Sequence, residues 1–172
     1  MPTTRSSTRP AAPEPTMQTA ARAFLSSPSF AVAGASSNPA KYGHILFTWY
    51  LSHSLPVTPL NPSSPSITIP SHPQPKSHAT VPSPSALPHP GQTALSIVTP
   101  PAVTSKVLKE ARDAGVRAVW LQPGSFGEEE LAYAEREWPG RAVGGFGEGT
   151  RGAEGWCLLV DGEAAMRGRE KM

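Results

Sequence analysis

Four short segments of the sequence carry groups that hold phosphates and amides but lack groups that transfer protons. They read Gly34-Ala35-Ser36-Ser37, Asn61-Pro62, Thr99-Pro100-Pro101 and Gln122-Pro123-Gly124. None of them contains a carboxylate, a cysteine or a histidine. Hydroxyls, carboxamides and backbone N–H groups at helix N-termini bind phosphates, whereas acid–base chemistry needs a titratable side chain. The segments therefore indicate a binding site, and we predict no catalytic residue.

The first segment offers two interpretations. Gly34 lets the backbone approach a ligand closely, and Ser36 and Ser37 can donate hydrogen bonds. Lys41 follows one turn into a predicted helix, where its ammonium group can lie near a pyrophosphate. The same residues also fit a capped helix with a solvated lysine, so this segment alone leaves both interpretations open.

Acidic residues are missing from most of the first half of the chain. No Asp or Glu lies between Pro15 and Lys109. Residues 1–109 carry a formal charge of +6 and residues 110–172 a charge of −4, which together give the net charge of +2. An anionic ligand bound by the first half would meet no fixed repulsion.

The glycine pattern disfavours a dehydrogenase. An NAD site normally shows Gly-x-Gly-x-x-Gly after a strand and an acid about 20 residues later. Here Gly34 is followed only by Gly43, and no acid follows for a long way. Residues 147–152 match the motif by letter, but they contain an acid and precede a predicted strand, so we expect a loop. The sequence has no Walker A motif either.

Cysteine and histidine usage indicates no metal site. Cys157 is the only cysteine, which excludes an internal disulfide and a cysteine-built zinc site and favours a reducing compartment. We expect it to be a buried, inert thiol. The histidines of the Pro/Ser-rich stretch are expected to be exposed, and those of the first domain helix to lie at the surface or at a helix end; they are His72, His78 and His89, and His44 and His53.

Alternating strand and helix patterns predict the α/β class. Strands are predicted over residues 29–34, 55–60, 94–98, 116–121 and 156–160, and helices over 17–26, 41–53, 102–114 and 128–138. This alternation predicts a single doubly wound parallel sheet of about five strands with helices on both faces. Such sheets bind ligands outside the carboxyl ends of their strands, where the first four segments would meet.

Composition sets the expected boundaries. Residues 1–16 are expected to be a disordered N-terminal tail, 17–162 the domain, and 163–172 a polar C-terminal tail. Eleven of the 21 prolines lie between His53 and Pro90, which predicts a Pro/Ser-rich loop over 62–90. No apolar stretch is long enough for a membrane helix. The N-terminal segment faintly resembles a mitochondrial transit peptide but lacks an apolar face, so we expect a cytoplasmic protein.

Taken in order, four motifs resemble a known family. They are Ala31-Val32-Ala33-Gly34-Ala35-Ser36-Ser37-Asn38-Pro39-Ala40-Lys41-Tyr42-Gly43, Pro56-Val57-Thr58-Pro59-Leu60-Asn61-Pro62, Ser96-Ile97-Val98-Thr99-Pro100-Pro101 and Val119-Trp120-Leu121-Gln122-Pro123-Gly124. The succession resembles the small stand-alone CoA-binding domain proteins, which are similar to the CoA-binding Rossmann domain of the succinyl-CoA synthetase alpha subunit. The Pro-rich stretch and an insertion at 144–155 depart from the family pattern without touching these motifs.

The resemblance implies a Rossmann-like fold and coenzyme A as the ligand. By position, Gly34 to Ser36 would approach the CoA phosphates, and Lys41 and Tyr42 would flank them. Asn61 would lie by the adenosine half. Residues 99–101 and 122–124 would line the rest of the groove. The synthetase's phosphorylated histidine lies in a domain that this chain does not contain, so the resemblance implies no synthetase activity.

Three hypotheses follow. The first is a non-catalytic module that binds CoA or an acyl-CoA, with no metal, no nucleic acid and no membrane as partner. The alternative is an NAD(P)-dependent oxidoreductase, or a ligase fragment that needs a partner chain. The third is a scaffold whose Pro-rich loop binds other proteins, since such loops favour the polyproline conformation.

Overall fold

Five parallel strands form the central sheet, as predicted. The computed structural model describes residues 16–146, 150 and 154–169. The strand order is β2-β1-β5-β6-β7, with β1 (Ser29–Ala33), β2 (Val57–Leu60), β5 (Thr93–Ile97), β6 (Ala118–Leu121) and β7 (Ala142–Val143). The chain places β2 on one side of β1 and the later strands of this sheet on the other. The strand order therefore reverses between β1 and β5, which is where doubly wound sheets bind ligands.

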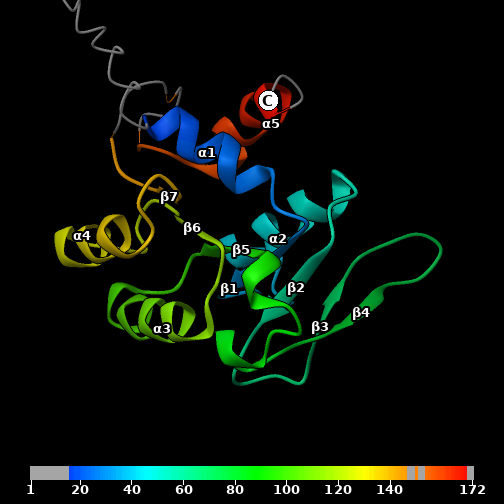
Figure 1. The fold of residues 1–172 in the computed structure, drawn as a ribbon. Helices are drawn as coiled ribbons and strands as arrows, with labels where there is room; N and C mark the ends of the chain where they lie inside the picture. Colours follow the sequence, from blue (N-terminus) through cyan, green and yellow to red (C-terminus); the bar gives the residue numbers. More distant parts are fainter. Residues whose placement is uncertain (1–15, 147–149, 151–153, 170–172) are drawn as a thin grey trace, which may run out of the picture.

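Helices cover both faces of the sheet, which confirms the α/β Rossmann-like class (Figure 1). One face carries α1 (Met17–Leu25), α2 (Tyr42–Ser52) and α5 (Leu158–Arg169), and the other carries α3 (Pro101–Ala114) and α4 (Glu128–Glu137). Successive strand residues point to opposite faces. Phe30 and Val32 of β1 thus pack in the core under α1, α2 and α5, whereas Ala31 and Ala33 pack in the core under α3 and α4. Trp120 is fully buried under the helices α1, α2 and α5.

The strand predicted over residues 156–160 is wrong. A short apolar run fits a buried strand and a buried helix equally well, because periodicity alone does not separate them. The chain instead begins α5 at Leu158, and this helix continues through Arg169, into the segment predicted as a polar tail. Asp161 is buried in the first turn of this helix. The fifth strand is β7, in a stretch where no strand was predicted.

The Pro/Ser-rich loop holds more structure than expected. It contains the antiparallel hairpin of β3 (Ser66–Ile69) and β4 (Lys76–Ala79), followed by the 3₁₀ turns η1 (Pro84–Ala86) and η2 (Pro90–Gln92). Pro59 lies inside β2. The position tolerates proline because β2 is an outer strand of the sheet, and the Pro59 carbonyl still accepts a hydrogen bond from the N–H of Val81 at 3.0 Å.

Two predictions concern residues that are mostly outside the described part of the chain. The tail over residues 1–16 is outside it except for Thr16, whose hydroxyl caps α1 by accepting from the N–H of Thr19. The glycine motif at 147–152 is outside it except for residue 150. No helix among the described residues has the length and apolarity to cross a bilayer. No group of three or more potential metal ligands occurs among them.

Candidate functional site

A groove of about 500 Å³ lies at the carboxyl ends of β1 and β5, at the switch point of the sheet. Its walls come from the β1–α2 turn, the first turns of α2 and α3, and the β6–α4 turn. The lining residues are Gly34, Lys41, Tyr42, Gly43, Val98, Thr99, Pro100, Pro101, Pro123 and Gly124. Eight of these belong to the fourteen residues that the sequence singled out; Gly43 and Val98 do not.

Two glycines shape the inner wall of the groove. Gly34 has φ = +97°, and a Cβ there would lie 3.0 Å from Cγ1 of Val98. A Cβ on Gly43 would lie only 1.9 Å from the carbonyl oxygen of Gly34. Gly43 therefore allows the N-terminus of α2 to lie directly against the β1–α2 turn, and Gly34 allows that turn to lie against Val98 and Thr99 after β5. The nine-residue interval between these glycines is visible in the sequence, but the sequence alone indicates only that it does not fit the NAD motif.

Several predicted ligand contacts hold the turn together instead of lining the groove. The Ser36 hydroxyl accepts from the N–H of Asn38 at 3.1 Å, and the Ser37 hydroxyl accepts from the N–H of Thr68 at 2.9 Å. The buried ring of His44 contacts the Ser36 carbonyl through Nδ1 at 2.9 Å. These contacts fix the turn before any ligand arrives.

Asn61 and Pro62, at the end of β2, are not among the lining residues. Both ends of the Asn61 carboxamide form hydrogen bonds within the protein. Its Nδ2 donates to the carbonyl of Ala35 at 3.0 Å, and its Oδ1 accepts from the N–H groups of Ser63 and Ser64 at 2.8 and 3.1 Å. Asn61 thus ties the end of β2 to the turn after β1.

The N-termini of α2 and α3 both open into the groove without an acid in their first turns. The residues before these helices, Lys41 and Pro100, make no side-chain cap. In contrast, α4 starts with three glutamates, and Glu130 caps it by accepting from the N–H of Gly127 at 2.9 Å. The first N–H groups of a helix have no intrahelical partner and carry partial positive charge. The groove therefore collects two helix ends that suit an anion.

Charge strengthens this preference for an anion. Lys41 is exposed and lines the groove, and none of the ion pairs found among the described residues includes it. No lining residue is acidic. The geometry thus offers one ammonium group and two helix N-termini to one ligand, with no carboxylate in the wall.

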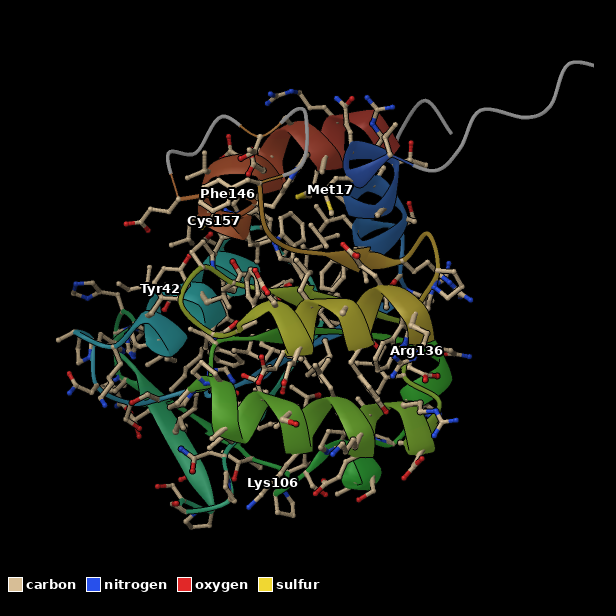
Figure 2. The ribbon with its side chains drawn as sticks, turned by 90° about the vertical axis from the view of Figure 1, so that its left-hand side faces the viewer. Met17, Tyr42, Lys106, Arg136, Phe146 and Cys157 are labelled. Atoms are coloured by element: carbon tan, nitrogen blue, oxygen red, sulfur yellow. The ribbon has the colours of Figure 1, made fainter. Side chains whose placement is uncertain are left out.

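Tyr42 lines the groove and contacts Cys157, which is not itself a lining residue. The Tyr42 hydroxyl lies 2.6 Å from Sγ of Cys157, and Figure 2 shows the two residues at the same end of the molecule. Burial raises the pKa of the Tyr42 hydroxyl well above its usual range, and the contact with Cys157 and the charge of Glu154 raise it further. Tyr42 therefore stays neutral at physiological pH. Cys157 is buried as predicted, but it immediately precedes a helix instead of lying on a strand.

Gln122 was predicted to line the groove, but its side chain is fully buried and is not part of the lining. Its Oε1 accepts from the N–H of Leu158 at 3.0 Å, in the first turn of α5. Asp161 accepts from the N–H of Cys157 at 3.1 Å in the same turn. Gln122 thus connects the β6–α4 turn, which lines the groove, to the start of α5.

Comparisons with known proteins agree with this fold. A protein from Pyrococcus furiosus described as a conserved hypothetical protein is 34% identical, and the match covers 63% of this chain and 86% of that one with a TM-score of 0.53. A hypothetical protein from Pyrococcus horikoshii OT3 is 19% identical over 91% of both chains, with a TM-score of 0.65. A Thermus thermophilus protein is 24% identical over 73% of this chain and 89% of that one, with a TM-score of 0.59. No curated protein matches the sequence significantly.

The family comparison is more specific. The model of the CoA binding domain matches residues 28–162, which include every strand of the central sheet and every residue that lines the groove. The chain therefore belongs to the CoA binding domain family.

Proposed function

We propose that this protein binds CoA or an acyl-CoA in the groove between β1 and β5, as a non-catalytic module. The observation that carries the proposal is the meeting of two uncapped helix N-termini with the ammonium group of Lys41, in a groove without a lining carboxylate. CoA carries a pyrophosphate and a 3′-phosphate, which are the groups that helix N-termini and lysines bind.

The groove residues support binding better than catalysis. Lys41, Tyr42 and Thr99 are the polar side chains among the lining residues. The Thr99 hydroxyl pairs with the hydroxyl of Thr104 at 2.8 Å, and no base contacts it among the contacts described. Because its pKa is raised, Tyr42 stays protonated at physiological pH and offers no phenolate to act as a base. A positioned nucleophile with a neighbouring base is therefore not part of the lining.

Calorimetric titration of the full chain with CoA, dephospho-CoA and NAD⁺ tests the ligand. We expect CoA to bind more tightly than NAD⁺, because the groove favours phosphates and Asn61 occupies the β2 end where a dehydrogenase keeps an acid. Absence of CoA binding at high micromolar concentration overturns the proposal. Incubation with acetyl-CoA should give no turnover, and steady release of free CoA would contradict the non-catalytic role.

Substitutions of two lysines, one in the groove and one away from it, test where CoA binds. Lys41→Gln should weaken CoA binding by about five- to tenfold, since it removes a charge-assisted contact from a partly solvated position. Lys106→Gln makes the same change of charge on α3, away from the groove, and should leave the affinity unchanged (Figure 2). If Lys41 faces the pyrophosphate, its loss should weaken CoA and dephospho-CoA by the same factor. An equal effect of both variants would mean that the phosphates bind elsewhere.

A further inference from the structure

A second cavity of about 380 Å³ lies between α2 and the hairpin of β3 and β4. It shares no lining residue with the groove at the switch point. Its lining residues are Thr48, Leu51, Ser52, Ile69, Pro70, Ser71, Lys76 and His78. A volume of this size is at the lower end of the range for small-molecule sites.

The hairpin turns an unusual set of side chains toward α2. Ile67 pairs with His78 across the hairpin, and Ile69 pairs with Lys76, so all four side chains share one face. Ile67 and Ile69 are 1% and 5% exposed, which identifies this face as the inner one. Apolar residues are expected at the two facing positions of β4, but the chain has an imidazole and an ammonium group there. The imidazole of His78 also meets the ring of Phe47 on α2 edge-on, with centroids 5.1 Å apart.

Two polar atoms in the cavity wall are buried without a hydrogen-bond partner. They are Oγ1 of Thr48 and Nε2 of His78, a residue that was expected to be exposed but is only partly so. A threonine within a helix usually bonds back to the carbonyl four residues earlier, but Thr48 does not. Leaving a buried polar atom unsatisfied costs about 1–3 kcal/mol. Both residues line the same cavity, so a ligand bound there is a candidate partner for both atoms.

The charge of the cavity wall indicates which class of ligand the cavity would bind. No lining residue is acidic, and none of the ion pairs among the described residues includes Lys76. Leu51, Ile69 and Pro70 supply an apolar wall beside these polar groups. We propose that this cavity is a second binding site, in which Thr48, Lys76 and His78 hold the oxyanion of a small organic acid, carboxylate or phosphate, and the apolar wall holds its body.

Nuclear magnetic resonance of the imidazole rings tests this proposal in the intact protein. The probes are benzoate, phenyl phosphate and the neutral benzyl alcohol, and His78→Gln assigns the His78 ring signals. We expect at least one of the two anions to shift these signals saturably, and benzyl alcohol not to shift them at the same concentration. Saturation by benzoate alone identifies a carboxylate site, and saturation by phenyl phosphate alone a phosphate site. Failure of both anions, or equal binding of benzyl alcohol, overturns the proposal.

Matched variants separate binding from folding. Lys76→Gln changes an exposed side chain and should weaken the bound anion about fivefold, whereas Lys106→Gln should not. Thr48→Val keeps the side-chain shape and removes a hydroxyl that has no internal partner. It should therefore weaken the anion without lowering Tm. A Thr48→Val variant that loses several degrees of Tm and keeps the anion affinity overturns the assignment.

Discussion

Gly43→Ala tests the close contact that shapes the groove. The new Cβ would lie 1.9 Å from the Gly34 carbonyl oxygen and 2.7 Å from its carbon. Both atoms belong to the backbone, so no flexible side chain can move aside. The α2 helix and the β1–α2 turn would have to separate by about 1 Å to reach the shortest Cβ contact found in proteins.

The expected magnitude combines two opposing effects. Alanine favours a helix over glycine by about 1 kcal/mol, which would stabilise α2. Overpacking costs about 1–3 kcal/mol, and a contact with rigid backbone is expected at the upper end of that range. The net prediction is a loss of about 2 kcal/mol, or a decrease of about 5 °C in Tm. CoA affinity should fall by about tenfold or more, because both glycines line the proposed site.

Urea denaturation and calorimetry measure the two effects separately, and Gly115→Ala supplies the control. Gly115 has φ = +79° at the far end of α3, with nothing within 4 Å of an added Cβ. Its substitution should cost about 1–2 kcal/mol through backbone strain alone and leave CoA affinity unchanged. If Gly43→Ala stays within about 0.5 kcal/mol of the wild type and binds CoA normally, the contact does not shape the groove.

Three further predictions concern the side of the sheet covered by α2 and α5. Burial raises the pKa of Tyr50, so its contribution to stability should be complete below about pH 10 and fall above it, because the unfolded chain ionises first. Above that pH the free energy of unfolding should fall by about 1.4 kcal/mol per pH unit, and Tyr50→Phe should remove this slope in denaturation measurements. The same pH dependence in the wild type and in Tyr50→Phe would contradict the prediction. Cys157 is buried and should react slowly with N-ethylmaleimide, as followed by mass spectrometry. Bound CoA should slow this reaction further, and Tyr42→Phe should accelerate it. An unchanged rate at saturating CoA would show that CoA does not bind next to Tyr42 and Cys157. Gly162→Ala would place a Cβ 2.6 Å from the Trp49 ring. The displaced ring should lower the free energy of unfolding by about 1–2 kcal/mol and change the near-ultraviolet circular dichroism spectrum. An unaltered spectrum would exclude displacement of the ring.

The outline of the groove could be predicted because its signals are local. A short apolar strand followed by Gly34 predicts a tight turn into a helix, and Pro101 fits the first position of α3. Such strand–turn–helix units place their turns at one edge of a parallel sheet whatever the remaining chain does. Local sequence patterns are therefore sufficient to predict which turns line the groove.

The roles of the polar residues in these turns could not be predicted in the same way. A hydroxyl or a carboxamide at a strand end can bind a ligand or the protein itself, and its residue type does not decide between them. Ser37 bonds to the hairpin through Thr68, and Asn61 bonds to the neighbouring turn through Ala35. Both partners are more than 25 residues away in the chain. Only the packing of the hairpin and of β2 against β1 reveals these contacts.

The error at residues 156–160 had a different cause and a consequence for the site. Trp156 and Leu158 are buried, but Val160 is 47% exposed, which fits one side of a helix and not a strand in the middle of a sheet. The signal for a helix lay outside the apolar run, because Asp161 and the distant Gln122 bond to N–H groups at the start of α5. In a strand, the Cys157 side chain would have pointed to one face of the sheet. The start of α5 instead places its sulfur against Tyr42, so a contact of one lining residue of the groove depends on the element that local sequence patterns did not identify.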